Sequence, residues 1–273
     1  MEKVALIFNF QSGKSNIINK VLKAKRILSK MFLVDVYSFN SDEKVLTIIK
    51  KEYDFLVVCG GDGTMHRIVN LMMKTENVTF PTIGYIPTGT MSDCMKGYGI
   101  DSFKSALKII MNKHCDYLNI GKCNNDYFLY LFASGTYSNI SYLTSRKSKK
   151  AFGKLSYYAL AFKEIFKKRM FDFCLNNINY KSPFIMILNG THVGGFNINK
   201  NFKNDSFLKC YITSPGIFNG LLHYFFDKKN AIIENETIKI SQRHQQYCLD
   251  GEMYKGQVFD IKKVLSKVKF IIK

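Results

Sequence analysis

Hydrophobic positions in the first part of the chain alternate between two kinds of pattern. Short, mainly apolar runs predict strands at residues 4–8, 33–37, 55–58 and 82–86. Between these runs, apolar residues recur every three or four positions, which predicts helices around residues 17–28, 45–49, 65–73 and 103–111, the last behind a cap at Asp101 and Ser102. Strands that alternate with helices are typical of a parallel sheet covered by helices. We therefore predict an α/β domain over residues 1–117.

From about Tyr117 the pattern changes. Short β-rich runs at residues 127–133, 184–188, 208–213 and 237–241 are separated by turns rich in Asn, Gly and Lys. One strong helix is predicted at residues 154–168, and its apolar stripe either packs into the core or lines a lipid pocket. The sequence therefore predicts a second, mainly β and sandwich-like domain over residues 118–258.

The charge of the chain is strongly positive. Forty Lys and Arg residues against 21 Asp and Glu give a net charge of +19, which attracts acidic partners such as nucleic acid or an anionic membrane surface. No nucleic-acid-binding motif is present, so no nucleic-acid partner is expected. A Lys- and Asn-rich composition typical of an AT-rich genome would also account for the excess.

No apolar run approaches the length of a membrane-spanning helix, because the longest is around residues 127–133. The seven cysteines are scattered and lack the spacing of a metal site, which is typical of a reducing compartment. These features predict a cytoplasmic protein that meets membranes only at their surface.

A glycine-rich loop follows the third predicted strand. Residues 59–64 read Cys-Gly-Gly-Asp-Gly-Thr and lead directly into a predicted helix. The glycines would permit positive φ angles and let backbone N–H groups approach an oligophosphate, next to the partial positive charge of the helix N-terminus. In this interpretation Gly60, Gly61, Gly63 and Thr64 bind phosphate, and Asp62 faces the Mg-nucleotide. The alternative is a plain turn from strand to helix, with Thr64 as the N-cap.

Two further motifs occur in a fixed order after this loop. They are Pro87-Thr88-Gly89-Thr90-Met91-Ser92-Asp93 and Asp250-Gly251-Glu252. Together with four weaker segments, this order resembles the diacylglycerol kinase catalytic-domain family, in particular the soluble bacterial lipid kinases. The weaker segments are residues 9–14, 153–158, 194–196 and 204–208. The sequence departs from the family pattern at Phe10, Ser92, Lys96, Phe196 and Ser206, and none of these changes removes a carboxylate.

The resemblance implies an ATP- and Mg²⁺-dependent enzyme whose final residues, 259–273, return to the first domain. It implies a structural Mg²⁺ site at Asp205, with Asp93 in the same water-linked network. Asn9, Ser12 and Lys14 would contact phosphate or ribose, although a lysine at such a position is also often a solvated residue at a helix start. Gly89 and Thr90 would border the nucleotide from the second loop.

Asp250 and Glu252 are two residues apart. In an extended segment their carboxylates would point the same way, and like charges at close range raise one pKa, which suits a general base. We therefore predict Glu252 as the base, with Asp250 as its partner or a metal contact. The alternative is an Asp-Gly hairpin turn.

The function predicted from these residues is transfer of the γ-phosphoryl group of ATP to the hydroxyl of diacylglycerol or a related membrane lipid. NAD kinases share the Gly-Gly-Asp-Gly-Thr loop, but they would not explain residues 87–93 or 153–157. A non-catalytic basic protein that binds membranes is the alternative from another class. A homodimer remains open.

Overall fold

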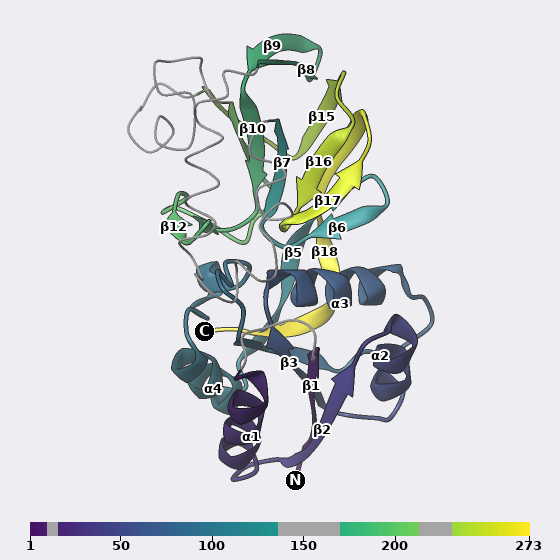
Figure 1. Ribbon diagram of the computed structural model, residues 1–273, viewed down its shortest axis with the longest axis vertical. Helices are drawn as coiled ribbons and strands as arrows, with labels where there is room; N and C mark the ends of the chain where they lie inside the picture. The colour runs from purple at the N-terminus through teal and green to yellow at the C-terminus, as the bar shows by residue number, and fades with distance from the viewer. Residues whose placement is uncertain (10–15, 136–169, 213–230) are drawn as a thin grey trace. The chain divides into compact units, whose positions relative to one another are not determined.

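The computed structural model describes residues 1–9, 16–135, 170–212 and 231–273, and in the last range the side chains only from residue 233. The chain forms two compact units (Figure 1). Unit 1 comprises Met1–Leu118 and Leu265–Lys273, and unit 2 comprises Asn119–Val264. The helix predicted at 154–168 lies outside the described residues.

Unit 1 contains the predicted parallel sheet. Its strands follow the order β2-β1-β3-β4 and all neighbours are parallel. Their bounds are β1 (Lys3–Asn9), β2 (Leu33–Phe39), β3 (Phe55–Gly60) and β4 (Thr82–Pro87). Strand β3 is buried along its whole length, as its uninterrupted apolar sequence predicts. The α/β prediction for this part of the chain is confirmed.

Helices cover both faces of this sheet. They are α1 (Ile17–Leu28), α2 (Asp42–Ile49), α3 (Asp62–Lys74) and α4 (Phe103–Asn112), with a short 3₁₀ turn η1 (Lys96–Tyr98). Helix α1 contacts α4, and α2 contacts α3; right-handed crossovers in this strand order place the two pairs on opposite faces (Figure 1). The predicted cap of α4 is confirmed, because Ser102 and Ser105 form a reciprocal capping box.

Unit 2 is a sandwich of two sheets. One is antiparallel with the order β14-β13-β10-β7-β16-β17. In the other, β18 pairs with β15, β15 with β8, and β8 with β9, while β5 pairs with β6 and β18. Their bounds are β5 (Cys115–Cys123), β6 (Asp126–Phe128), β7 (Leu131–Gly135), β8 (Phe171–Leu175), β9 (Ile178–Ser182), β10 (Phe184–Leu188), β13 (Leu208–Ile212), β14 (Ala231–Asn235), β15 (Thr237–Gln242), β16 (Gln246–Leu249), β17 (Glu252–Lys255) and β18 (Val258–Ile271), and a separate hairpin is formed by β11 (His192–Val193) and β12 (Phe196–Asn197).

One apolar core joins the two sheets of unit 2. Phe132 and Ile187 from the first sheet and Phe173, Ile240 and Phe259 from the second belong to a single buried cluster. The rings of Phe132 and Phe259 meet edge-on with centroids 5.3 Å apart. The mainly β, sandwich-like prediction is therefore confirmed.

Strand β18 contributes to both units. Its first residues pair antiparallel with β15, and Phe270 near its end pairs parallel with Ile83 of β4. Phe270 and Ile271 are fully buried in unit 1. The sequence shows two apolar clusters in this segment, and the structure forms one strand of 14 residues.

Candidate functional site

The two glycine-rich loops of unit 1 leave adjacent strands at the same edge of the sheet. Gly60 at the end of β3 pairs with Pro87 at the end of β4. The carbonyl oxygen of Gly60 accepts hydrogen bonds from the Thr88 N–H at 2.8 Å and from the Tyr85 hydroxyl at 3.1 Å. These bonds hold the start of the second loop against the first. In open α/β sheets this carboxyl edge is where ligands bind.

These glycines allow the backbones of the two loops to approach each other closely, and they do not adopt positive φ angles. A Cβ atom on Gly89 would lie 2.6 Å from the Cα of Gly61, and one on Gly60 would lie 2.5 Å from the Thr64 side chain. Gly60, Gly61, Gly63 and Gly89 are not among the residues with positive φ, so that part of our interpretation is wrong. The loops touch backbone to backbone, which leaves room only for glycine.

The alternative interpretation of Thr64 as N-cap is also wrong. Gly61 is the N-cap of α3, and the helix begins at Asp62. Thr64 lies in the first turn, where it is buried against Gly60. The turn is set by the contact between Gly61 and Gly89, which outweighs the preference of a threonine for the capping position.

Asp62 links the two loops. Its Oδ1 accepts a hydrogen bond from the Cys94 N–H at 2.9 Å. As the first residue of α3, the Asp62 carboxylate also lies at the positive end of the helix dipole. Asp62 therefore sits where both loops and the helix N-terminus converge.

The second loop contains a buried ion pair. Asp93 is 1% exposed, and its Oδ1 lies 2.6 Å from the Lys96 Nζ. The resemblance pointed to Lys96 only as a departure from the family's arginine, so its role as the partner of Asp93 was missed. Thr88 in the same loop is buried, and its hydroxyl has no hydrogen-bond partner among the described residues.

The remaining nucleotide-site candidates are only partly described. Asn9 ends β1, the strand between β2 and β3, so it lies at the same edge of the sheet as the two loops. Ser12 and Lys14 lie outside the described residues, as do residues 153–158. Thr90 is half-buried beside Gly89.

Asp250 and Glu252 do not lie on one extended segment, so the paired-carboxylate prediction is wrong. Asp250 and Gly251 form a hairpin turn between β16 and β17, with φ angles of +51° and +91°. The Asp250 carboxylate accepts backbone N–H bonds from Leu129 at 2.7 Å, Tyr130 at 2.9 Å and Leu131 at 3.1 Å. A carboxylate that accepts three backbone hydrogen bonds has a structural role. Glu252, in contrast, is exposed at the start of β17.

Asp205 lies in unit 2 and Asp93 in unit 1. Asp205 accepts from the Phe207 N–H at 3.1 Å and lies 3.3 Å from the Nζ of Lys263. Burial is the main cause that lowers the pKa of Lys263, and the neighbouring Asp205 opposes this shift. Within the part of the chain that the structure describes, no group of three or more His, Cys, Asp and Glu residues could hold a metal ion.

A polar cluster in unit 2 was not predicted. The Ser134 hydroxyl lies 2.7 Å from the His244 Nε2 and donates to the Gln242 Oε1 at 2.6 Å. The His244 ring packs on Phe171, with centroids 4.5 Å apart, and burial lowers the pKa of His244. No sequence signal could reveal this pair, because Ser134 and His244 are 110 residues apart.

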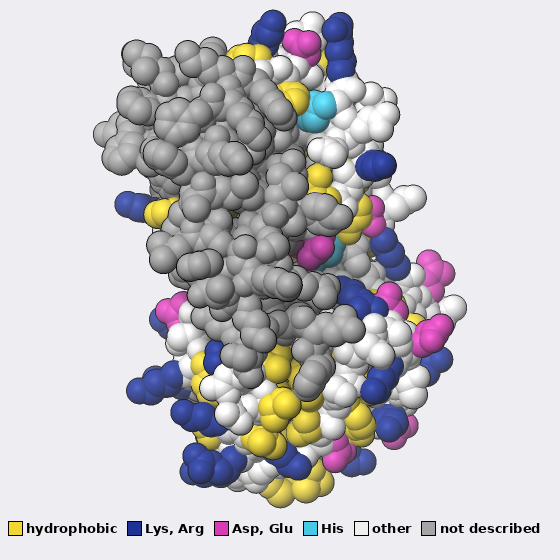
Figure 2. Space-filling model, viewed as in Figure 1, with side chains coloured by type: hydrophobic (Ala, Val, Ile, Leu, Met, Phe, Trp, Pro, Cys, Tyr) yellow, Lys and Arg dark blue, Asp and Glu magenta, His cyan; other side chains and the backbone are white. Residues whose placement is uncertain are grey.

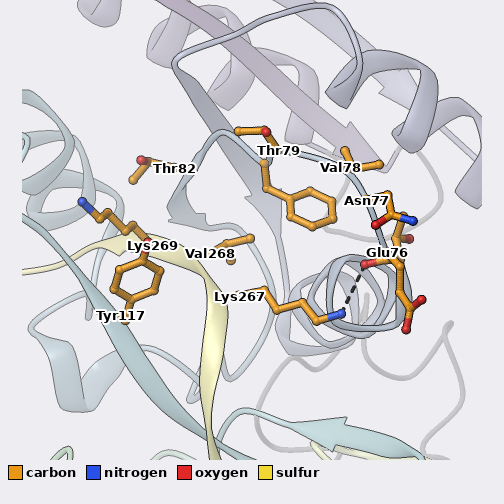
Figure 3. A pocket seen from close by; sticks show the side chains of 11 residues that line it. Glu76, Asn77, Val78, Thr79, Thr82, Tyr117, Lys267, Val268 and Lys269 are labelled. Carbon is orange, nitrogen blue, oxygen red and sulfur yellow. Dashed lines mark hydrogen bonds between the residues drawn. The ribbon is translucent and has the colours of Figure 1, made fainter.

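A cavity in the described part of unit 1 lies away from the glycine-rich loops. It measures about 470 Å³ and is lined by residues 75–80, Thr82, Tyr117 and residues 267–269 (Figure 3). The Nζ of Lys267 donates to the Thr75 carbonyl at 3.3 Å, and the Lys269 Nζ lies 5.5 Å from the Tyr117 ring centroid. Because Thr82 begins β4 and the second loop follows its end, this cavity is separate from the candidate site.

The candidate site fits a polyphosphate and its metal. Gly61 and Gly89 are only partly buried where their backbones meet, the N-terminus of α3 favours negative charge, and the Thr88 hydroxyl is buried without a partner among described residues. Mg²⁺ is usually held by one or two carboxylates together with substrate phosphates, so a dedicated cluster of protein ligands is not required. Asp62 is a carboxylate at the junction of the two loops.

Comparisons with known proteins support the resemblance read from the motifs. Residues 3–123 match the family described as "Diacylglycerol kinase catalytic domain". A diacylglycerol kinase of Staphylococcus epidermidis is 34% identical over 125 residues, which cover 45% of this chain and 39% of that protein. One from Staphylococcus aureus is 35% identical over 123 residues, covering 45% and 38%. The matched segment thus spans about two fifths of the length of these relatives. Within the matched residues, the resemblance to the diacylglycerol kinase family is confirmed.

The whole fold has a counterpart among solved structures. A crystal structure of a diacylglycerol kinase from Bacillus anthracis superimposes with a TM-score of 0.79 and covers 100% of this chain and 97% of that one. The two sequences are 21% identical, so this likeness concerns the fold. It extends the similarity to unit 2, where the family model does not match.

Proposed function

We propose that the protein is a lipid kinase that transfers the γ-phosphoryl group of ATP to the hydroxyl of diacylglycerol or a similar membrane lipid. The observation that carries the proposal is the junction of two glycine-rich loops at Gly61 and Gly89, next to Asp62. The matches to diacylglycerol kinases support the reaction class. No helix in the described residues is long and apolar enough to cross a membrane.

The chain's own residues supply the positioning that phosphoryl transfer requires. Gly60, Gly61, Gly63 and Thr64 would cradle the phosphates, with Gly89 and Thr90 beside them and Asn9, Ser12 and Lys14 contacting phosphate or ribose. Asp62 would hold Mg²⁺, which neutralises phosphate charge when bound. The ion pair of Asp93 with Lys96 would fix the second loop.

Glu252 is the proposed general base, because its carboxylate is exposed and Asp250 is engaged. It would take the proton from the lipid hydroxyl as the oxygen attacks the γ-phosphorus. Asp250 would act as a positioning residue that holds the turn from which Glu252 projects. A structural Mg²⁺ at Asp205 remains part of the proposal.

The test is an assay of ATP consumption with diacylglycerol in detergent micelles, with NAD, or with neither. We expect Mg²⁺-dependent formation of ADP and phosphatidic acid in the first sample alone. Formation of NADP would identify an NAD kinase. Absence of turnover in all samples would favour the non-catalytic membrane-binding alternative.

A further inference from the structure

Unit 1 exposes large apolar side chains mostly in one stretch of the sequence. Seven such side chains are exposed among its described residues, and five of them fall in the first 33 residues. These five are Met1, Ile18, Leu22, Met31 and Leu33. Figure 2 shows apolar side chains gathered over the part of the molecule where Figure 1 places α1 and β2, with Lys and Arg side chains on both sides. Exposed apolar groups gathered in this way mark interaction surfaces.

Helix α1 carries the centre of this surface. Its buried face consists of Ile17, Val21, Ala24 and Leu28. Ile18 and Leu22, which are 47% and 57% exposed, follow each other one turn apart on a different face. At about 100° per residue, Lys25 and Arg26 fall within the same arc of roughly 100°. We call these four residues the α1 face.

The charged residues of α1 and of the segment that follows it are of one sign. Residues 16–33 contain five cations and no acidic residue. The cations are Lys20, Lys23, Lys25, Arg26 and Lys30. The nearest carboxylates in sequence are already engaged, since Glu2 pairs with Lys113 and Asp35 accepts from the Tyr53 hydroxyl. Helix α2, in contrast, begins with Asp42 and Glu43.

We propose that the α1 face docks the protein on the surface of an anionic lipid bilayer. Apolar side chains beside Lys and Arg on an exposed helix suit the boundary between acyl chains and phosphate head groups. A basic residue near an anionic leaflet contributes about 1 kcal/mol, so Lys25 and Arg26 on the α1 face favour such membranes. This inference rests on the proposed function for its choice of partner.

The position of the α1 face relative to the candidate site supports this occupant. Helix α1 follows the carboxyl end of β1, so Ile18 and Leu22 in its first half lie toward the sheet edge that carries Gly61 and Gly89. A membrane bound there would lie beside the edge at which the phosphates are proposed to bind.

The test is co-sedimentation with vesicles in the absence of nucleotide. The vesicles consist of phosphatidylcholine alone or with about 30% phosphatidylglycerol. We expect Ile18→Ser/Leu22→Ser and, separately, Lys25→Gln/Arg26→Gln to weaken binding to the anionic vesicles about tenfold each. The matched controls lie in unit 2. They are Phe207→Ser/Ile178→Ser, whose side chains are likewise 47% and 57% exposed, and the charge-matched Lys239→Gln/Lys262→Gln.

Equal binding by the native protein and both α1-face variants would overturn the inference. A second outcome would also overturn it: sedimentation velocity finds that the native protein is a dimer and that Ile18→Ser/Leu22→Ser is a monomer. A second copy of the chain would then cover the α1 face. Turnover of diacylglycerol in detergent micelles separates the two proposals. If the α1-face variants lose vesicle binding but retain turnover in micelles, docking is supported. If the native protein shows no turnover in micelles, only the proposed function is refuted.

Discussion

At the scale of single residues, Asp62 combines a structural bond with a proposed catalytic charge, and the two can be separated. Asp62→Asn keeps an oxygen to accept the Cys94 N–H but removes the charge. We expect at least a 100-fold loss of turnover, since charge placement is the proposed task, with little change in melting temperature. Asp62→Ala should lose both turnover and stability. Unchanged turnover in Asp62→Asn at saturating ATP and Mg²⁺ would remove Asp62 from the nucleotide site.

The two acidic residues of the β16–β17 hairpin should behave differently. Glu252 is exposed, so Glu252→Gln should lower kcat by about 10²- to 10⁴-fold, the range for a lost general base, without changing stability. Steady-state kinetics and thermal unfolding of the purified variant measure both. A change confined to the KM for ATP would make Glu252 a binding residue.

Asp250→Asn should instead destabilise the protein. Both oxygens of the native carboxylate accept backbone N–H bonds. In asparagine an NH₂ group replaces one of these oxygens and cannot accept, so one or more of the three bonds is lost. Hydrogen bonds to charged groups are worth about 1.5–3 kcal/mol, and we expect a loss of about 2–4 kcal/mol in chemical denaturation. A variant as stable as the native protein would show that the Asp250 carboxylate does not stabilise the fold.

At the scale of elements, the contact between the two loops makes a graded prediction. Gly89→Ala would place a Cβ 2.6 Å from a backbone atom, whereas Gly61→Ala would place one 3.3 Å from its neighbour. Overpacking of this kind costs about 1–3 kcal/mol, so Gly89→Ala should unfold at clearly lower denaturant and Gly61→Ala less so. The reverse order would contradict the contact as described.

A half-buried histidine, His244, precedes β16 in unit 2 and contacts Ser134 of β7, and its protonation makes stability depend on pH. Burial lowers the pKa of His244, so as pH falls below about 6.5 the unfolded chain takes up a proton before the native one does. Stability should therefore decrease between pH 7.5 and pH 5.5. In His244→Gln this decrease should be smaller, as measured by urea unfolding at both values. Identical pH dependence in the two proteins would exclude His244 as the source.

The sequence allowed the elements near these sites to be predicted only where their causes are local. Strands β3 and β4 and the cap at Ser102 are determined by residues close to them in the sequence, and so they could be predicted. The same holds for the α/β pattern. The start of α3 at Asp62 depends on Gly89, and the geometry of Asp250 depends on backbone donors about 120 residues away. Such long-range contacts leave no trace in local spacing, so the Asp-Gly hairpin could be considered but not chosen.

At the scale of the whole molecule, burial predicts which cysteines react. It raises the pKa of Cys59, Cys123, Cys210 and Cys248 to about 12, so these thiols stay protonated at pH 8. Cys115 and Cys174 are only partly buried. Mass spectrometry after brief treatment of the native protein with iodoacetamide should find these two alkylated first. Early modification of Cys59 or Cys248 would show that the core opens readily.

Strand β18 sets an order for biosynthesis. A ribosome delivers β1 to β4 early and Leu265–Lys273 only after all of unit 2. Until then, the β4 edge that Phe270 occupies is an unpaired strand edge, and such edges promote association between chains. The α/β unit therefore cannot complete its sheet until unit 2 has been synthesised, and a nascent chain must keep this edge from aggregating until Leu265–Lys273 has emerged.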